Sequence, residues 1–349
     1  MKKPALFHLE QGFSLLVIII ILALVSTAAF LFYRQFGSNL SISSTKPNKV
    51  YQIIAFNPNK KAFTELEKGF TDGLKNLGYI QGQNLNYTSL ETNTGQADFQ
   101  KQLDSAINAK PDLLVGFTNE AIVPIYKAEI ASKTNIPLLA SSPFDVKELG
   151  ITNYNGSGNF VAAVTAGGPE LNKKRLQVVK QVLPNAKTVA IITNPKQPNY
   201  NGSIDPLRDV APGLGMSIVE YQVTTQAELD QLLNTIKKGD ADILMTAAQI
   251  LFVNNVNKIY DTATNKGIPT LDFRLTSTDH VLITYGHIFS DLGAQSAIMA
   301  DKILKGSSPG SIPVEEPRKV IYAINLKIAS RLGVNVPDSI LSQADKIIK

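Results

Sequence analysis

Short apolar runs alternate with longer amphipathic stretches along residues 49–349, and this alternation limits the fold more than any other feature of the sequence. A strand that is apolar along its whole length belongs in a parallel sheet covered on both faces, because none of its side chains faces water. Regular alternation of strands and helices predicts right-handed βαβ units. We therefore expect an α/β fold.

The alternating pattern occurs twice in succession. In its first half it predicts strands at 50–56, 85–90, 113–117 and 136–140, with helices at 63–77, 98–109 and 122–133. In its second half it predicts strands at 189–193, 218–223, 243–246, 269–273 and 281–285, with helices at 170–182, 205–214, 226–237 and 254–266. A last helix at 292–305 ends before Gly306, and 320–332 is expected to pass from a strand into a helix. We expect two doubly wound parallel-sheet lobes with a hinge between them.

The N-terminal segment has the composition of a membrane anchor. No residue from Gln11 to Tyr33 is charged, and an apolar helix of about 20 residues spans a bilayer. Lys2 and Lys3 precede it, so the positive-inside rule favours a cytoplasmic N-terminus and an exported body. We expect a transmembrane anchor within residues 1–36, crossing the cytoplasmic membrane through residues 13–33. Residues 37–48 are expected to form a polar linker.

Two alternatives for this segment stay open. Cleavage after Ala29 would make it a secretory signal, although the apolar run is long for one. Gln11-Gly12-Phe13 resembles the processing site of type IV prepilins, but Val17 stands where that family has a glutamate.

Composition argues against several classes of protein. The net charge is +5, yet the lysines are scattered, whereas nucleic-acid binding requires a basic stripe. The chain has no cysteine, which excludes disulfides, thiolate metal sites and a lipid-modified cysteine. Its three histidines are His8, His280 and His287, too few for a metal cluster. Common catalytic and phosphate-binding motifs are also missing. We expect no nucleic acid, metal, cofactor or catalysis.

A series of short motifs resembles one family of ABC transporter substrate-binding proteins, best known for tryptophan- and tyrosine-type members. The first motifs are Lys68-Gly69-Phe70 and Gly78-Tyr79, and further motifs follow toward the end of the chain. Its later parts are Lys110-Pro111-Asp112, Gly158-Asn159, Leu183-Pro184, Gly286, Leu292-Gly293, Gly306, Pro313, Ile324-Asn325 and Leu332-Gly333. The resemblance as a whole covers about residues 49–346.

This resemblance implies a type I periplasmic-binding fold with three crossovers between its lobes, near 161–168, 288–292 and 317–321. Lobe one would comprise residues 49–163 plus 289–318, and lobe two residues 164–288 plus 319–349. The family has Thr-Asp-Asn after the third strand of lobe two, whereas this chain has Thr246-Ala-Ala-Gln249. This difference leaves open whether the chain binds the ligand that is usual for the family.

Candidate ligand-binding residues follow the predicted strands, because ligands of open parallel sheets lie outside the carboxyl ends of the strands. In lobe one, Asn57 can exchange hydrogen bonds with a ligand or form a turn before Pro58. Thr118 and Asn119 begin a helix whose free N–H groups can hold a carboxylate, or simply cap it. Asp145 is the candidate partner of a ligand ammonium group, or a solvated loop charge.

In lobe two the candidates are loop amides and two residues at strand ends. Asn194 and Asn199 flank two prolines, which fix a loop or a turn. Gln249 stands where the family tends to have a charge. Asp272 either contacts ligand or pairs with Arg274. Tyr285 either stacks on a flat ligand or belongs to the core or its rim.

These features predict the extracytoplasmic solute-binding component of an ABC-type importer. An amino acid or related small carboxylate is the expected ligand, with a nucleoside or sugar as the alternative. The expected protein partners are the ABC permease subunits in the membrane. The alternative function is that of a membrane-tethered ligand-sensing or interaction module.

Overall fold

The computed structural model describes residues 49–349 except 93–95, 145 and 168. The predicted anchor at 13–33, the alternatives for its processing and the linker at 37–48 therefore lie outside the described residues. Within the part that is described, no helix has both the length and the apolar character needed to cross a membrane.

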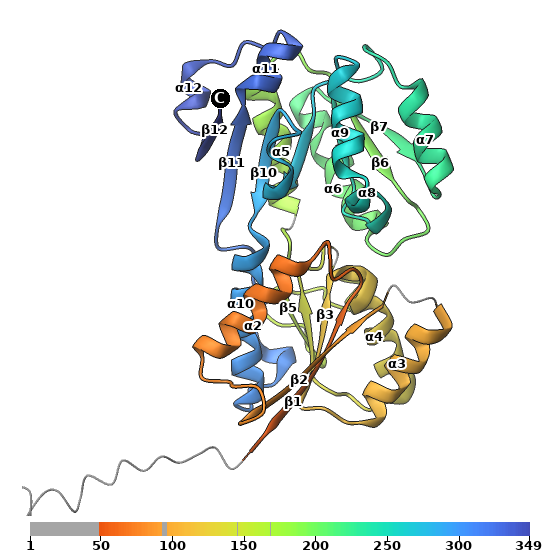
Figure 1. Cartoon of the computed structure of the whole chain (residues 1–349), viewed down its shortest axis with the longest axis vertical. Helices are drawn as coiled ribbons and strands as arrows, with labels where there is room; N and C mark the ends of the chain where they lie inside the picture. The colour runs from red at the N-terminus through yellow and green to blue at the C-terminus, as the bar shows by residue number, and fades with distance from the viewer. Residues whose placement is uncertain (1–48, 93–95, 145, 168) are drawn as a thin grey trace, which may run out of the picture. The chain divides into compact units, whose positions relative to one another are not determined.

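Sheet 1 is five-stranded and parallel, in the order β2-β1-β3-β4-β5 (Figure 1). Its strands are β1 (Tyr51–Asn57), β2 (Leu85–Glu91), β3 (Leu113–Phe117), β4 (Leu138–Ser141) and β5 (Val161–Val164). Its helices are α2 (Thr64–Asn76), α3 (Gln96–Asn108) and α4 (Thr118–Ser132), with the short η1 (Lys147–Leu149). Alternate residues of β1 enter two cores: Ile53 joins Phe70 of α2 on one face, and Phe56 joins Ile122 of α4 on the other. The sheet is thus covered on both faces, as its apolar strands require.

Two further sheets contain the later strands. Sheet 2 has the order β7-β6-β8 and sheet 3 the order β12-β11-β10-β9, with a bridge between Leu244 and Thr270 joining β8 to the start of β9. Their strands are β6 (Thr188–Thr193), β7 (Ser217–Gln222), β8 (Ile243–Thr246), β9 (Leu271–Arg274), β10 (Ile283–His287), β11 (Val320–Asn325) and β12 (Lys346–Ile348). The α-helices here are α5 (Pro169–Val182), α6 (Tyr200–Val210), α7 (Gln226–Thr235), α8 (Ile250–Asn254), α9 (Val256–Asn265), α11 (Leu326–Leu332) and α12 (Asp338–Leu341). The 3-10 turns are η2 (Pro212–Leu214) and η3 (Leu275–Ser277).

Helix α10 (Phe289–Leu304) leaves sheet 3 and packs beside α2 of sheet 1 (Figure 1). Glycines allow this close crossing. A Cβ atom on Gly69 would lie 2.1 Å from the carbonyl oxygen of Ser290, and one on Gly293 would lie 2.0 Å from that of Leu66. After α10 and η4 (Pro309–Ser311), the chain forms a bridge between Glu315 and Val164 at the end of β5, then returns to sheet 3 as β11.

The predicted α/β fold with parallel sheets is confirmed, although α8, α12 and β12 were not predicted and two strands differ from the expectation. Residues 161–164 form the buried strand β5, where the sequence indicated only a crossover. Strand β11 runs antiparallel to β10, with Tyr322 opposite Tyr285. The direction follows from the path of the chain: the chain leaves sheet 3 at the carboxyl end of β10 and re-enters the sheet at that same end as β11.

Candidate ligand-binding site

Sheet 1 contacts sheets 2 and 3 through residues at or beyond the carboxyl ends of strands. Asn59, two residues beyond β1, donates from Nδ2 to Oδ1 of Asn254 at 2.8 Å. The backbone N–H of Asn199 donates to Oε2 of Glu148 at 3.3 Å. These contacts lie near the carboxyl ends of the strands, which is where open parallel sheets commonly bind ligands.

In sheet 1 the predicted polar residues hold their own loops. Nδ2 of Asn57 donates to Glu67 at 2.7 Å, and its Oδ1 accepts from the backbone N–H of Asn59 at 3.1 Å. Thr118, at φ +62°, donates from Oγ1 to Oε2 of Glu120 at 2.7 Å. Asn57 and Thr118 therefore shape the loops after β1 and β3.

Asn119 is fully buried and positions the loop after β4. Its Oδ1 accepts the backbone N–H of Phe144 at 2.7 Å. This bond fixes the loop that carries Phe144 toward sheet 3. The next residue in that loop, Asp145, lies outside the described residues.

The predicted amides of sheet 2 form a second loop network. Gln249 accepts the N–H of Asn194 at 2.6 Å and donates to its carbonyl oxygen at 2.9 Å. Asn199 has a left-handed backbone at φ +68° and donates from Nδ2 to Ala248 at 2.9 Å. Its Oδ1 is buried without a hydrogen-bond partner. Of these three amides, Asn199 is the one that has a buried side-chain atom without a hydrogen-bond partner.

Asp272 forms an ion pair with Arg274, which was one of the two roles predicted for it from the sequence. Its Oδ2 lies 2.9 Å from Nε of Arg274, and both side chains are almost fully buried. Asp272 also accepts from Ser277 Oγ and from the backbone N–H of Phe273. The carboxylate thus orients Arg274, whose Nη2 reaches Thr246 Oγ1 at 3.4 Å.

Tyr285 lies apart from these contacts. Its half-buried ring is tilted against Tyr322 with centroids 5.9 Å apart. Both rings line a pocket of about 200 Å³ formed by α5, β10, β11 and the C-terminal segment. The structure therefore does not bring the Tyr285 ring together with the loops of sheet 1.

Sequence reasoning missed a group of rings and guanidinium groups, which we call the Arg–aromatic cluster: Phe144, Arg175, Phe273, Arg274 and His287. The Phe144 and Phe273 rings are 5.1 Å apart, and His287 lies 6.1 Å from Phe273 and 6.4 Å from Phe144. The guanidinium carbons of Arg175 and Arg274 lie 5.5 and 4.8 Å from the Phe273 ring centroid. Phe144 follows β4 of sheet 1, whereas the other four residues belong to α5 and sheet 3. The cluster therefore joins the part of the chain around sheet 1 to the part around sheet 3.

Burial controls the charges of the Arg–aromatic cluster. It lowers the pKa of His287 to about 3, with further lowering from the charges of Arg175 and Arg274. Burial also lowers the pKa of Arg175 to about 10, which leaves the guanidinium charged at neutral pH. The cluster is therefore cationic through its arginines, while the imidazole is neutral.

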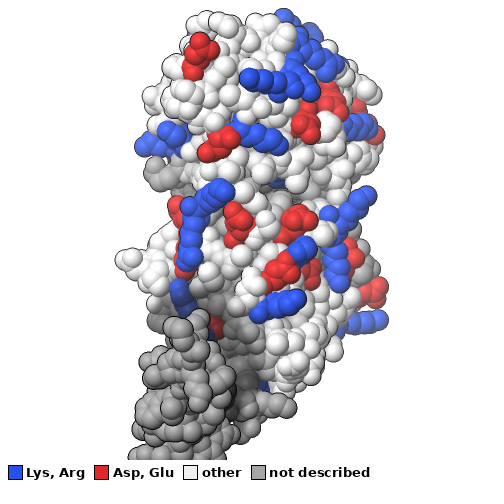
Figure 2. Space-filling view, turned by 60° about the vertical axis from the view of Figure 1, so that its left-hand side comes forward, with Lys and Arg blue, Asp and Glu red and all other residues white. Residues whose placement is uncertain are grey.

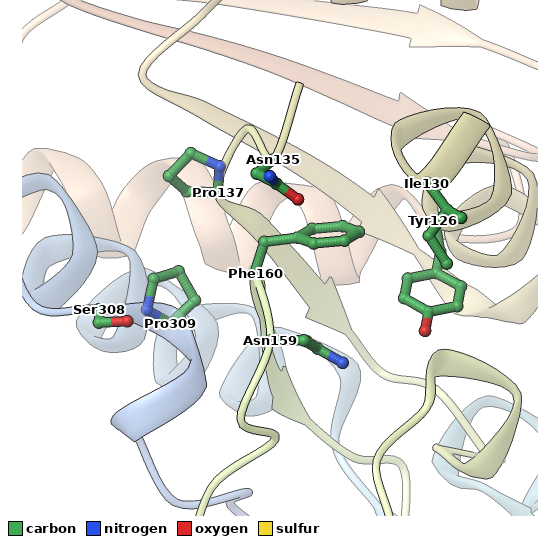
Figure 3. A pocket seen from close by; sticks show the side chains of 8 residues that line it. All are labelled: Tyr126, Ile130, Asn135, Pro137, Asn159, Phe160, Ser308 and Pro309. Carbon is green, nitrogen blue, oxygen red and sulfur yellow. The ribbon is translucent and has the colours of Figure 1, made fainter. Parts of the chain in front are cut away.

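A separate pocket of about 530 Å³ lies at the opposite edge of sheet 1 (Figure 3). Its lining includes Asn135 and Pro137 before β4, and Asn159 and Phe160 before β5. The Phe160 ring stacks on Tyr126 with centroids 5.5 Å apart. Because these residues precede their strands, this pocket belongs to the amino edge and not to the candidate site.

The remaining features are the charges on the surface and the side chains that could bind a metal ion. On the face in Figure 2, Lys and Arg are interspersed with Asp and Glu among the coloured residues. Among the described residues, no group of three or more His, Asp or Glu side chains could hold a metal ion.

Comparison with known proteins identifies the family. The family model described as ABC transporter substrate binding protein matches residues 50–348. The tyrosine-binding protein of Clostridioides difficile (strain R20291) is 24% identical over 290 residues, which are 80% of each chain. A conserved domain protein from Vibrio cholerae has a similar structure, with a TM-score of 0.76 and 21% identity over 86% of this chain and 100% of the other. An ABC domain from Streptococcus pneumoniae in complex with L-Trp gives a TM-score of 0.75 at 18% identity, with the same coverage. The chain belongs to the ABC transporter substrate-binding protein family.

Proposed function

We propose that this substrate-binding protein captures a small polar molecule outside the cytoplasmic membrane and delivers it to the permease of an ABC importer. The observation that carries the proposal is the Arg–aromatic cluster at the carboxyl edges. It combines flat apolar surface with buried polar groups from two parts of the molecule, as small-molecule sites commonly do. Capture would be reversible and would involve no covalent chemistry.

The binding site would lie between two lobes, formed by residues 49–163 plus 289–318 and by residues 164–288 plus 319–349. Support comes from α10, which packs on α2 although it follows β10 in the chain. The bridge between Val164 and Glu315 also holds residues of this late segment against sheet 1. Opening and closing of the lobes would then admit and retain the ligand.

The ligand would be an amino acid or a related small carboxylate. Two relatives support this class: one is named a tyrosine-binding protein, and the other was solved in complex with L-Trp. The two buried guanidinium groups suit a carboxylate and the phenyl rings suit a flat side chain. Among the predicted residues, Asn199 would add a hydrogen bond, whereas Asn57, Thr118, Asn119, Asn194 and Gln249 would shape the site through its loops.

The test is ligand screening on the full chain purified in detergent. Thermal-shift and native mass measurements against amino acids, nucleosides and sugars should give saturable stabilisation by one class. A ligand present at about 100 times its Kd should add about 2.7 kcal/mol to the stability. Recovery of the compound unchanged is expected, and its conversion into a product would contradict the proposal.

Residues 13–33 would anchor the protein, with its body on the outer side of the membrane. Protease added to spheroplasts should then degrade residues 49–349 without lysis. Protection of the body in intact spheroplasts would contradict an extracytoplasmic location.

A further inference from the structure

The amino edge of sheet 1, opposite the candidate ligand-binding site, exposes apolar side chains. In parallel βαβ units a helix ends where the next strand begins, so helix ends and strand starts share this edge. Six large hydrophobic side chains are exposed in the described part of the chain, and four of them lie here. They are Val50 before β1, Leu77 at the end of α2, Ile80 before β2 and Ile130 in the last turn of α4. Single exposed hydrophobic residues are common, but this shared location indicates a surface that contacts something other than water.

The same edge has an excess of positive charge. Two of its lysines are paired: Lys49 lies 2.7 Å from Asp112, and Lys305 lies 2.9 Å from Asp301. A third carboxylate at this edge, that of Glu129, is buried and accepts from Thr134 and from the Ile136 backbone. Three further lysines are exposed and form no ion pair with any residue that the structure describes: Lys75, Lys110 and Lys133. We call the four apolar residues and these five lysines the amino-edge surface.

Two of these lysines occupy backbone positions that usually favour glycine. Lys110 follows α3 with φ +47°, and Lys133 ends α4 with φ +56°. Glycine or asparagine is usual there, because a larger side chain strains the left-handed conformation. A lysine at such a position supplies a charge that glycine could not. The helix macrodipole favours a cation at a helix end, but it does not explain the aliphatic side chains at the same edge.

The path of the chain indicates what this surface faces. Strand β1 begins at the amino edge, and residues 34–48 connect it to the predicted anchor at 13–33. A chain of that length spans at most about 50 Å, so an anchored protein would keep this edge within reach of the membrane. Lysines attracted to anionic lipid, together with aliphatic side chains that enter the headgroup region, are the combination by which proteins bind a membrane surface.

We propose that the amino-edge surface docks on the anionic lipid surface of the membrane. This inference rests on the membrane anchor in the proposed function and goes beyond it, because it gives the body a preferred orientation. The lysines would attract the surface to the lipid, and Val50, Leu77, Ile80 and Ile130 would enter the headgroup region.

The experiment measures which part of the body touches lipid. The chain contains no cysteine, so an introduced cysteine carries a fluorophore at one place only. The full chain with Ile80→Cys or Ile130→Cys is reconstituted in nanodiscs of phosphatidylcholine, alone or mixed with phosphatidylglycerol. Lipids with a nitroxide quencher on the headgroup should quench both labels in the mixed nanodiscs. Gly213→Cys is the control and should stay unquenched, because it precedes β7 at the amino edge of sheet 2 and its Cβ position is open.

Lysine variants test the role of charge. A lysine near an anionic surface contributes about fivefold to binding. Lys75→Gln, Lys110→Gln and Lys133→Gln, combined in one labelled protein, should therefore lower the ratio of docked to undocked protein about a hundredfold. Added salt should weaken the quenching in the natural chain, because it screens exposed charges. The matched control combines Lys187→Gln, Lys237→Gln and Lys346→Gln, which change the net charge equally but lie around sheets 2 and 3, and it should keep the quenching.

Each contrary result has a separate meaning. Equal quenching of the labels at 80 and 213 would overturn the proposed orientation. Quenching that needs neither phosphatidylglycerol nor the three lysines would overturn docking on anionic lipid. No quenching at 80 or 130, in protein that elutes with the nanodiscs, would defeat this inference in favour of a protein partner or water at this surface, while the anchor of the proposed function stands. Protein that elutes without the nanodiscs would count against both.

Discussion

The ring of Phe144 meets the ring of Phe273 edge-on, with centroids 5.1 Å apart and ring planes at 70°. Phe144 follows β4 of sheet 1, and Phe273 lies in β9 of sheet 3. Asn119 holds the Phe144 backbone through a 2.7 Å hydrogen bond, so the position of this ring is set within sheet 1. The pair is therefore a contact between the part of the chain that forms sheet 1 and the part that forms sheet 3.

Replacing Phe144 by Ala should weaken ligand binding. The Phe144–Phe273 pair would stabilise the closed form of the two proposed lobes, and an edge-to-face pair contributes about 1 kcal/mol beyond its buried area. Its loss would favour the open form and lower the affinity about fivefold. Calorimetry with a compound that stabilises the natural chain measures this loss. Phe160→Ala is the matched control, because Phe160 stacks on Tyr126 at the opposite edge of sheet 1. Equal losses in the two variants would contradict a specific role for the Phe144–Phe273 contact.

Replacing Asp272 by Asn should destabilise the fold strongly. The variant leaves the buried Arg274 guanidinium without its counter-charge, and breaking one partner of a buried pair costs about 3–5 kcal/mol. Denaturant unfolding followed by circular dichroism gives the change. Asp72→Asn is the control, because Asp72 pairs with Lys68 on the surface and water screens that pair. A stable Asp272→Asn protein with weakened ligand binding would instead make Asp272 a ligand-binding residue.

Replacing Gly293 by Ala should disturb the crossing of α10 and α2. The added Cβ would lie 2.0 Å from the Leu66 carbonyl oxygen and 2.6 Å from the Phe70 nitrogen, and backbone atoms cannot move aside locally. Overpacking of this kind costs about 1–3 kcal/mol or more, measurable as a lower unfolding midpoint. Gly213→Ala is the control, since no atom lies within 4 Å of its Cβ position. Unchanged stability in Gly293→Ala would mean that the two helices can separate without cost.

Most elements of the fold could be predicted because their apolar pattern reflects burial on both faces. The strand predicted at 113–117 is β3, in which every residue is buried. Strand β5 was missed because it is four residues long and follows a glycine-containing loop, which indicated only a crossover. The direction of β11 could not be predicted either, because periodicity carries no information on the edge at which a strand enters its sheet.

The candidate site was harder to predict than the fold. Asn57 is the last residue of β1 and Gln249 follows β8, but their side chains hold nearby backbone and side-chain groups. The sequence cannot distinguish that role from ligand contact. Arg175 lies within a helix, while Phe273 and His287 lie within strands, where aromatic side chains usually indicate a core. What brings these three residues together is the packing of α5 against sheet 3, which only the structure shows.

His287 should make the stability of the protein depend on pH. Burial and the charges of Arg175 and Arg274 lower its pKa to about 3 in the folded chain, below the value of about 6.5 for an exposed histidine. Between these two values the unfolded chain binds more protons, so this contribution to stability is complete above about pH 6.5 and is lost as the pH falls toward 3.

Replacing His287 by Phe tests this dependence, because the phenyl ring suits neighbours such as Phe273 and Phe289 and does not titrate. Unfolding free energies of the two proteins should diverge below pH 6.5, with the natural chain losing up to about 1.4 kcal/mol more per pH unit. His280→Asn is the control for replacing a histidine outside the Arg–aromatic cluster, because His280 lies nearer the surface beside Asp261. A constant difference between His287→Phe and the natural chain across this window would mean that His287 gains a proton without opening the Arg–aromatic cluster.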